Sequence, residues 1–470
     1  MINVVFMKNN IKKDTELIIF FILILPLCSI IYPWAGVGIM LIASLYFALQ
    51  NDYRTLLFFV CIILVQNITL AIGANKFNSL TTTIYSICKE AMLYGCILCV
   101  FFRKRKTTKY TLLFSIFLII LTGTFFCSSA GTYAKIVSLR QMLLPFICFF
   151  FGKELNITNN KLNKIGKLII YSGLVIGFFG FLELFVWKDS MWNIIPLWKY
   201  QVNKGTIFQF TNGLPTNFTT YDLMPITGTI CRRLVSVFVD PLLTGHFLFI
   251  GFILADTFVD KHKKIIKYIL FLCSALTLSK GVILGYIFYV GLKLLKRLSY
   301  KDFNNSLGIG LVSGLCILTI LYSFVMKYLP TSSTAIHFKG FIGGITEASL
   351  FGNGLGTAGS ITGVLTDSSK MLTAESYIGT LNAQMGYVGL IIFIVYWGYI
   401  FIRLVRKGKL SNDKLSYNSA ILLISVITES LFSESSITIV GTGLYFIFTG
   451  LCMNSKGFLQ CKNMESQTYK

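Results

Sequence analysis

The sequence predicts an all-α, polytopic integral membrane protein that forms a single membrane domain over residues 1–470. Of its residues, 55% are hydrophobic and only 13% are charged, and its mean hydropathy is +0.72. A soluble protein cannot bury that much apolar surface, so lipid is the solvent of this chain. The net charge of +23 sits in short clusters between apolar runs, which is typical of membrane loops and argues against a nucleic-acid-binding face.

Apolar runs near the length of a transmembrane helix recur along the whole chain. Because a span needs about 20 residues, the runs predict about 12–14 transmembrane helices. The first run follows Lys8, Lys12 and Lys13 without a small-residue cleavage pattern after it, so we expect it to remain as the first helix. The predicted spans are 16–33, 35–49, 55–73, 82–102, 110–126, 135–152, 168–187, 241–259, 265–279, 281–295, 306–327, 385–405, 418–432 and 437–453.

The basic residues predict the orientation. With the amino terminus inside and the spans alternating, the inside segments hold 29 of the 42 Lys and Arg residues, and the outside segments hold 11. Cytoplasmic loops carry the excess of Lys and Arg, so both termini are predicted inside. Two long polar stretches, 187–240 and 327–384, then become outer loops.

The segment 265–295 is predicted to turn back on itself as a short helical hairpin. Basic clusters flank both of its ends, so both ends are expected inside. Each half has about 15 residues, or about 22 Å as helix, which is less than the ~30 Å hydrocarbon core. The segment is either two short helices that cross with strain or a re-entrant hairpin. In both cases we expect Lys280, at the tip, to point into an outward-facing cavity.

The cysteines predict neither a disulfide framework nor a metal site. The chain has 12 of them, and most lie inside apolar runs, where cysteine packs as a small hydrophobic residue. None has a metal-ligand spacing to a histidine.

Arg140 lies in the middle of a predicted span, where a charge costs ~2.5–3.5 kcal/mol. Such a residue normally faces a cavity or a partner, so Arg140 is a candidate substrate-binding residue. The structural alternative is a buried ion pair with Glu90 or Glu183.

Arg232 and Arg233 end the first outer loop, shortly before Asp240 and Pro241. The planar guanidinium group binds phosphate oxygens bidentately and stays charged. Adjacent arginines at the outer mouth of a membrane protein therefore predict a phosphate or pyrophosphate site. The alternative is that both side chains reach lipid headgroups.

The second outer loop holds three further candidates. His337, one of three histidines, is a candidate base or phosphate ligand, and the alternative is a solvated loop residue. Gly352, Gly354 and Gly356 either place N–H groups around an anion or turn the chain sharply. Glu375 is a candidate general base for a sugar hydroxyl, and the alternative is a carboxylate at a helix entry.

Four segments within about residues 230–400 share the pattern of a known family. They are Arg233-Leu-Val-Ser236-Val-Phe-Val-Asp240-Pro241 with Gly245, Leu276-Thr277-Leu278-Ser279-Lys280-Gly281, Ser349-Leu350-Phe351-Gly352-Asn353-Gly354-Leu355-Gly356, and Ala374-Glu375-Ser376-Tyr377 with Gly386 and Gly389. In this order, and on a matching topology, they resemble the O-antigen polymerase and O-antigen ligase superfamily, which includes the Wzy-type polysaccharide polymerases.

The resemblance implies an inverting, metal-independent membrane glycosyltransferase without a cofactor, placed in a bacterial inner membrane. Its donor and acceptor would be undecaprenyl-pyrophosphate-linked oligosaccharides, polymerised at the outer face into O-antigen, capsule or exopolysaccharide. On this basis we expect four cations to hold the donor pyrophosphate: Arg232, Arg233, Lys280 and Arg140. Arg233 would also stabilise the developing charge, Glu375 would act as base, and His337 would assist at the phosphate or share the base role. Asp240, Gly352, Gly354 and Gly356 would shape the loops.

Two positions bear on the choice within the family. The family often has arginine where this chain has His337. Ligases tend to have histidine at the position of Glu375, whereas polymerases often have glutamate, which favours a polymerase. The alternatives are a ligase that transfers polysaccharide to lipid A-core, a lipid-linked oligosaccharide flippase, and a peptidoglycan polymerase, whose motifs we do not find. A flippase would be expected to show pseudo-symmetric halves, which the sequence lacks. Binding of a chain-length regulator protein stays open.

Overall fold

The computed structural model confirms a helical, multi-pass membrane protein. Its described part is about 80% helical with almost no strands. Within that part, eight helices are long and apolar enough to cross a membrane. The described residues are 14–50, 52–101, 109–205, 210–211, 213–222, 224–296, 323, 327–328, 333–346, 348–359 and 376–454.

Helices occupy the expected spans that the structure describes. The eight long ones are Asp14–Ile31, α3 (Pro33–Gln50), α4 (Tyr53–Ile72), α6 (Lys109–Cys127), α7 (Thr132–Glu154), α8 with its π-helical end (Asn159–Trp187), α12 (Pro241–Phe258) and α18 (Tyr377–Leu410). Five others that fall on expected spans are α5 (Ser79–Phe101), α13 (Lys263–Leu276), α14 (Lys280–Lys296), α19 (Lys414–Glu429) and α20 (Gly443–Met453). The expected span 306–327 lies almost entirely outside the described residues.

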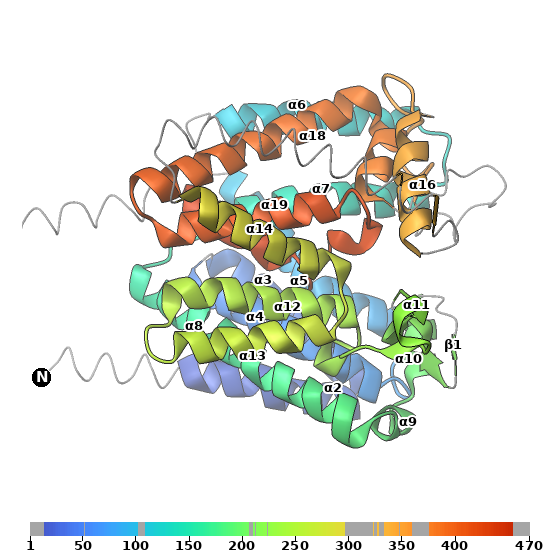
Figure 1. The fold of residues 1–470 in the computed structure, drawn as a ribbon, viewed down its shortest axis with the longest axis vertical. Helices are drawn as coiled ribbons and strands as arrows, with labels where there is room; N and C mark the ends of the chain where they lie inside the picture. Colours follow the sequence, from blue (N-terminus) through green and yellow to red (C-terminus); the bar gives the residue numbers. More distant parts are fainter. Residues whose placement is uncertain are drawn as a thin grey trace, which may run out of the picture. The chain divides into compact units, whose positions relative to one another are not determined.

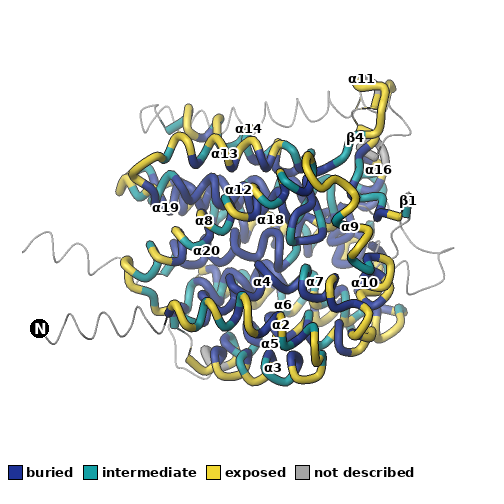
Figure 2. The backbone as a smooth tube through the Cα atoms, turned by 90° about the horizontal axis from the view of Figure 1, so that it is seen from below, coloured by how far each residue is buried: buried dark blue, intermediate teal, exposed yellow. Residues whose placement is uncertain are grey.

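The chain divides into two compact units, and unit 1 comprises residues 1–104, 147–279 and 453–470. Its interior is formed by α4 and α12, of which 89% and 72% are buried over their most apolar stretch (Figure 2). Helices α8 and α13 pack on α12. Close approach requires small residues at such helix contacts: a Cβ at Gly166 of α8 would lie 2.2 Å from the ring of Phe258.

Unit 2 comprises residues 105–146 and 280–452. Here α18 packs against α6, α16 (Ser333–Thr346) and α19, and α14 packs against α19. An aromatic cluster forms part of its core, with ring centroids 4.5 Å apart between Phe117 and Phe146 and 5.3 Å apart between Phe146 and Trp397. Such contacts give α6, α7 and α18 a common buried surface.

The loops of unit 1 gather at two ends. At one end, Asn203 Nδ2 donates to the carbonyls of Ala74 (3.1 Å) and Phe77 (2.8 Å). At the other end, Asn454 Nδ2 donates to the carbonyl of Leu155 (2.9 Å). The segments that meet at each end are the ones that the basic residues assign to a common side.

The first polar loop folds into short elements at the first of these ends (Figure 1). Two antiparallel pairs, β1 with β2 and β3 with β4, join neighbouring parts of the loop. The elements are α9 (Ser190–Ile194), α10 (Leu197–Lys204), β1 (Phe210–Thr211), β2 (Leu214–Pro215), β3 (Thr219–Thr220), α11 (Met224–Thr227), β4 (Cys231–Arg232) and a 3-10 turn, η4 (Ser236–Phe238).

The expected hairpin at 265–295 consists of two helices that belong to different units. Helix α13 packs on α8 and α12 in unit 1, whereas α14 packs on α19 in unit 2. The hairpin prediction was based on length and flanking charge, and neither of these reveals which partner each apolar face has.

The second polar loop ends in helical turns that were not predicted, because α18 begins at Tyr377 and kinks at Gly386, close to the predicted start of the span at 385. Ser376 caps this helix, accepting a hydrogen bond from the N–H of Gly379 (3.0 Å). The polar residues of its first turns are buried and paired. Asn382 Nδ2 donates to the carbonyl of Gly344 (3.0 Å), and Gln384 Nε2 donates to that of Ala358 (2.6 Å). These distant acceptors are invisible in a local hydropathy pattern.

Candidate functional site

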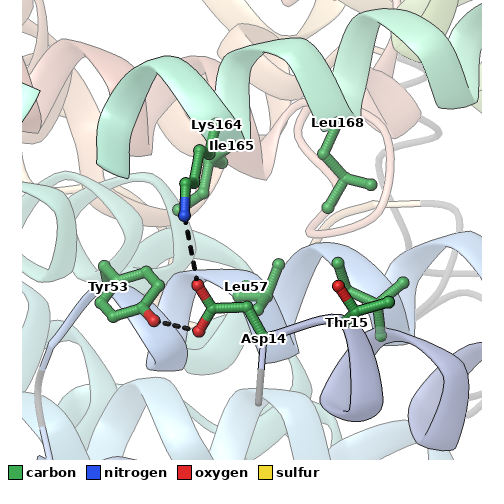
Figure 3. A pocket seen from close by; sticks show the side chains of 8 residues that line it. Asp14, Thr15, Tyr53, Leu57, Lys164, Ile165 and Leu168 are labelled. Carbon is green, nitrogen blue, oxygen red and sulfur yellow. Dashed lines mark hydrogen bonds and ion pairs between the residues drawn. The ribbon is translucent and has the colours of Figure 1, made fainter. Parts of the chain in front are cut away.

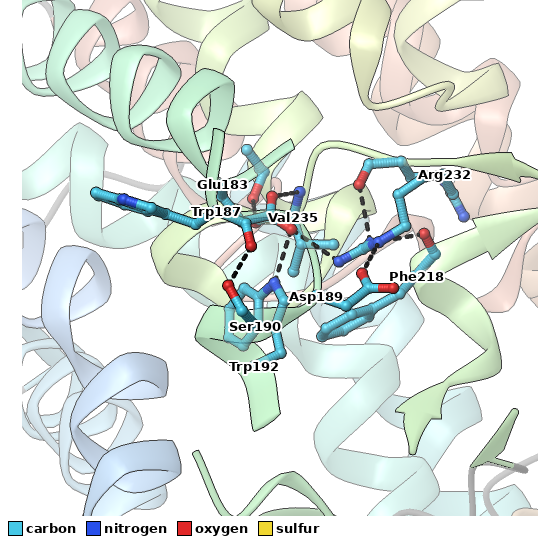
Figure 4. Close-up of polar contacts among 10 residues, drawn as sticks. Glu183, Trp187, Asp189, Ser190, Trp192, Phe218, Arg232 and Val235 are labelled. Carbon is cyan, nitrogen blue, oxygen red and sulfur yellow. Dashed lines mark hydrogen bonds and ion pairs between the residues drawn. The ribbon is translucent and has the colours of Figure 1, made fainter. Parts of the chain in front are cut away.

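Arg232 is bound by acidic side chains and backbone carbonyls of unit 1 (Figure 4). Its Nη2 donates to Glu183 Oε1 (2.8 Å) and its Nε to Asp189 Oδ1 (3.1 Å). Its Nη1 donates to the carbonyls of Phe218 (2.9 Å) and Arg233 (3.1 Å). Four of the five guanidinium N–H groups are therefore used, and two carboxylates balance the charge.

Glu183 explains why Arg232 lies where it does. This carboxylate ends the long helix α8 and is fully buried. Besides Arg232, it accepts hydrogen bonds from Trp192 Nε1 (2.7 Å) and the N–H of Val235 (3.1 Å). A buried carboxylate needs such partners. The oxygens of Glu183 therefore bind Arg232 and the start of the segment that follows it.

Arg233 has a different environment. Only 9% of the residue is exposed, and its guanidinium contacts carbonyls alone. Nε donates to Thr277 (2.8 Å), Nη1 to Asn217 (3.3 Å) and Nη2 to Leu278 (3.5 Å). Among the described residues, no carboxylate oxygen lies within 4.0 Å of it. Arg233 is thus a buried cation without an ion-pair partner in the described part of the chain.

The contacts of Arg233 leave two N–H groups that a bidentate ligand could accept. Three of the five guanidinium N–H groups donate to carbonyls, so one N–H remains on each terminal nitrogen. Two such N–H groups match the spacing of two phosphate oxygens. Burial lowers the pKa of the Arg233 guanidinium, while Asp240 and Asp222 act in the opposite direction. Arginine starts from so high a value that the group stays charged. Beside the turn that Arg233 holds, Ser279 Oγ is buried and has no hydrogen-bond partner among the described residues.

Asp240 shapes the backbone around this group. It is the N-cap of α12, and its Oδ1 accepts from the N–H groups of Leu242 (2.8 Å) and Leu243 (3.0 Å). Its Oδ2 accepts from Asn217 Nδ2 (3.2 Å), and the carbonyl of Asn217 accepts from Arg233. These bonds fix the backbone at the start of α12. The first two of the four family-like segments, around Arg233 and Thr277, are in direct contact.

The loop at residues 352–356 of unit 2, here called the glycine loop, donates its N–H groups to acceptors within the protein. The N–H groups of Asn353 and Gly354 donate to the carbonyls of Ala383 (2.9 Å) and Gln384 (3.0 Å), and that of Gly356 donates to Gln384 Oε1 (3.3 Å). Those of Gly352 and Leu355 also have backbone acceptors. The loop is therefore a sharp turn docked on α18 and not an anion cradle. This contact joins the third and fourth family-like segments.

Each glycine of this loop has a conformation or a contact that excludes a side chain. Gly352, Gly354 and Gly356 all have positive φ, at 76°, 93° and 82°. A Cβ at Gly352 would lie 2.4 Å from the carbonyl oxygen of Gln384. In return, a Cβ at Gly386, where α18 kinks with φ 69° and ψ −176°, would lie 2.3 Å from the nitrogen of Gly352. The loop and the kink of α18 therefore leave no room for a side chain at Gly352 or at Gly386.

The remaining predicted residues lie in unit 2 or outside the described part of the chain. Arg140 is exposed on α7, next to Gln141. His337 is half-buried on α16, a helix where an irregular loop was expected, and Lys280 is the half-buried first residue of α14. Glu375 lies outside the described residues, immediately before the cap of α18.

Two buried carboxylates of unit 2 escaped the sequence analysis. Glu429 is 6% exposed and lies against the start of α14, where a Cβ at Gly281 would be 1.9 Å from its carboxyl carbon. Glu434 is also 6% exposed, and its Oε1 accepts from Gln141 Nε2 (3.4 Å). Glu429 falls inside the predicted span 418–432, so the rule that selected Arg140, a charge within an apolar span, would have found it.

No protein-family model matches this chain, and no curated protein is similar to it. Within the described ranges, no group of three or more His, Cys, Asp or Glu residues is placed to hold a metal ion. The distinguishing feature of the site is the buried Arg233, with two N–H groups that donate to no acceptor among the described residues.

Proposed function

We propose that this protein is a membrane glycosyltransferase that polymerises undecaprenyl-pyrophosphate-linked oligosaccharide units into a surface polysaccharide. It would act at the outer face of a bacterial inner membrane, with both termini inside and about 12–14 spans. The observation that carries the proposal is Arg233, a buried cation without a carboxylate partner among the described residues. Keeping a charge buried is costly unless a counter-charge arrives, and a pyrophosphate supplies one.

In this proposal Arg233 holds the donor pyrophosphate and stabilises the charge that develops as it leaves. Its two unused N–H groups, one on each terminal nitrogen, match two phosphate oxygens. The unpartnered hydroxyl of Ser279 adds a third donor at the neighbouring turn. A preorganised fork of this kind costs no reorganisation during the reaction, which is why its carbonyl contacts matter.

The other candidates take distinct roles. Arg232, whose donors and charge are already matched by Glu183 and Asp189, becomes a positioning residue and no longer a ligand. Lys280 and Arg140 stay as further cations for the pyrophosphate. Glu375 would take the proton of the acceptor hydroxyl as that oxygen attacks the anomeric carbon, and His337 would assist. The scheme includes no metal and no cofactor.

The proposal is tested with purified protein and a defined lipid-linked repeat unit. Arg233→Ala is expected to abolish polymer formation. Arg233→Lys is expected to restore little, because an ammonium cannot make the two parallel bonds. Lys76→Ala, which removes one exposed basic charge in a loop of the same unit, is the matched control. Full-length chains from Arg233→Ala, at normal expression, would contradict the proposal.

Glu375→Gln separates the base from the pyrophosphate site. It is expected to leave single repeat units bound to the carrier, with no ladder on a polysaccharide gel, because the glutamine amide cannot accept the proton. Normal ladders would remove Glu375 as base while leaving Arg233 in place. Deletion of the gene distinguishes the alternatives: surface products of one repeat indicate a polymerase, and polymer left on the lipid carrier indicates a ligase. Absent surface polymer indicates a ligase or a flippase.

A further inference from the structure

A second charged cluster lies in unit 1, at the end that also holds Asn454, and is independent of the proposed function. Asp14 accepts a hydrogen bond from the hydroxyl of Tyr53 and lies 3.6 Å from Lys164 Nζ and 3.9 Å from Arg54 Nε (Figure 3). Lys161 Nζ lies 3.6 Å from the centroid of the Tyr53 ring. Two cations, from α4 and α8, therefore flank one buried carboxylate, and a third, Lys161, lies over the neighbouring ring of Tyr53.

The cations of this cluster retain donors for a ligand. Lys164 has 52% of its side chain exposed. Lys161 has no carboxylate within 4.0 Å among the described residues. Arg54 Nε is buried and has no hydrogen-bond acceptor in the described part of the chain. Asp52, which also lies near Arg54, is used as the N-cap of α4, so the three basic groups outnumber the carboxylates of Asp14 and Glu16 that line the neighbouring hollows.

Two apolar hollows extend from this cluster along opposite faces of the first helix, Asp14–Ile31. The first, of about 220 Å³, lies towards α4 and α8. The second, of about 540 Å³, lies towards α3 and α4 and includes Arg54 and Glu16 at its polar end. Its wall includes Phe20 and Ile24, which bound a π-helical stretch of the first helix. Such widened turns recur at functional sites.

We propose that this cluster binds a bilayer phospholipid, with the phosphate diester on Lys161, Lys164 and Arg54 and the acyl chains in the two hollows. Charge and shape both lead to this occupant. The hollows are apolar and open from spans that lipid surrounds, and their common polar end carries cations. Basic pockets between transmembrane helices bind lipid headgroups. A soluble phosphate compound would use the cations but leave both hollows unfilled.

Three probes separate the contributions of phosphate and chains. Full-length protein in neutral detergent is titrated with dioctanoylphosphatidylglycerol, with dioctanoylglycerol, which lacks the phosphate, and with glycerol 3-phosphate, which lacks the chains. Binding is read as adducts in native mass spectrometry and as a rise in melting temperature. Only the first probe is expected to bind in the micromolar range, because each of the others lacks one half of the recognised structure.

The variants test the named residues. Lys161→Ala with Lys164→Ala is expected to weaken phosphatidylglycerol binding about 25-fold, from about fivefold for each basic charge. Lys167→Ala, one turn further along α8 and exposed, is expected to bind as the wild type does. Equal binding of dioctanoylglycerol or of glycerol 3-phosphate would overturn the proposal, as would equal losses in the double variant and in Lys167→Ala. Melting curves without lipid verify that each variant is folded.

Discussion

Gly386→Ala is expected to disrupt the junction between the glycine loop and α18. At φ 69° and ψ −176°, the backbone lies in a region that is essentially restricted to glycine, and a side chain there costs ~1–3 kcal/mol. The added Cβ would also lie 2.3 Å from the nitrogen of Gly352 and 2.3 Å from the carbonyl oxygen of Leu350, more than an ångström short of ordinary contact. Overpacking of this kind adds ~1–3 kcal/mol, so the total is about 2–6 kcal/mol.

The assay is thermal melting of the full-length protein in detergent. Gly398→Ala, on the same helix, is the matched control, because a Cβ there meets nothing within 4 Å. Alanine in a regular helix is favoured over glycine by about 0.5–1 kcal/mol, so this variant should melt at or above the wild-type temperature. Equal melting temperatures for Gly386→Ala and Gly398→Ala would contradict the clash expected at Gly386. The double variant Gly386→Ala with Gly352→Ala should lose less stability than the sum of the two single variants, because both substitutions disrupt the same junction.

Two further outcomes concern residues at the two ends of the first polar loop. Glu183→Ala leaves the buried side of Arg232 without its carboxylate and is expected to destabilise the protein by about 3–5 kcal/mol, whereas Glu183→Gln keeps an acceptor and costs less. Equal melting temperatures for the wild type and Glu183→Ala would contradict this role. Asp240→Ala removes the cap of α12 and should cost about 0.5–2 kcal/mol, whereas Asp240→Asn, which also caps, should melt near the wild type. Identical losses in both Asp240 variants would argue against capping.

The features that the sequence predicts well are those set by local composition. Apolar runs of about the right length become helices because a backbone in lipid must satisfy its hydrogen bonds within the helix. Asp240 before Pro241 predicts a capped helix start, and that is what forms. The family-like segments also proved informative as pairs, since Arg233 contacts the turn at Thr277 and the loop at Gly352 contacts Gly386.

The features that the sequence does not reveal depend on contacts between distant residues. Arg232 and Arg233 are adjacent and look equivalent, yet one meets Glu183, 49 residues away, and the other meets only carbonyls. The helical turns of α18 before its kink at Gly386 are missed because Asn382 and Gln384 look like loop residues until their buried acceptors are known. Both errors arise because the hydropathy pattern does not include tertiary hydrogen bonds.

The turn at residues 277–279 occupies a particular position in the chain. It follows the last helix of one continuous part of unit 1 and leads directly into α14, the first helix of the next part of unit 2. Leu278 has a positive φ of 49°, which a leucine rarely adopts, and its carbonyl accepts from Arg233 at 3.5 Å. An anion bound to the second N–H of Nη2 would share that nitrogen with the carbonyl of Leu278. Occupancy of Arg233 and the conformation of the connection are then linked equilibria, and such linkage is reciprocal: the connection would report ligand binding, and its conformation would set the affinity.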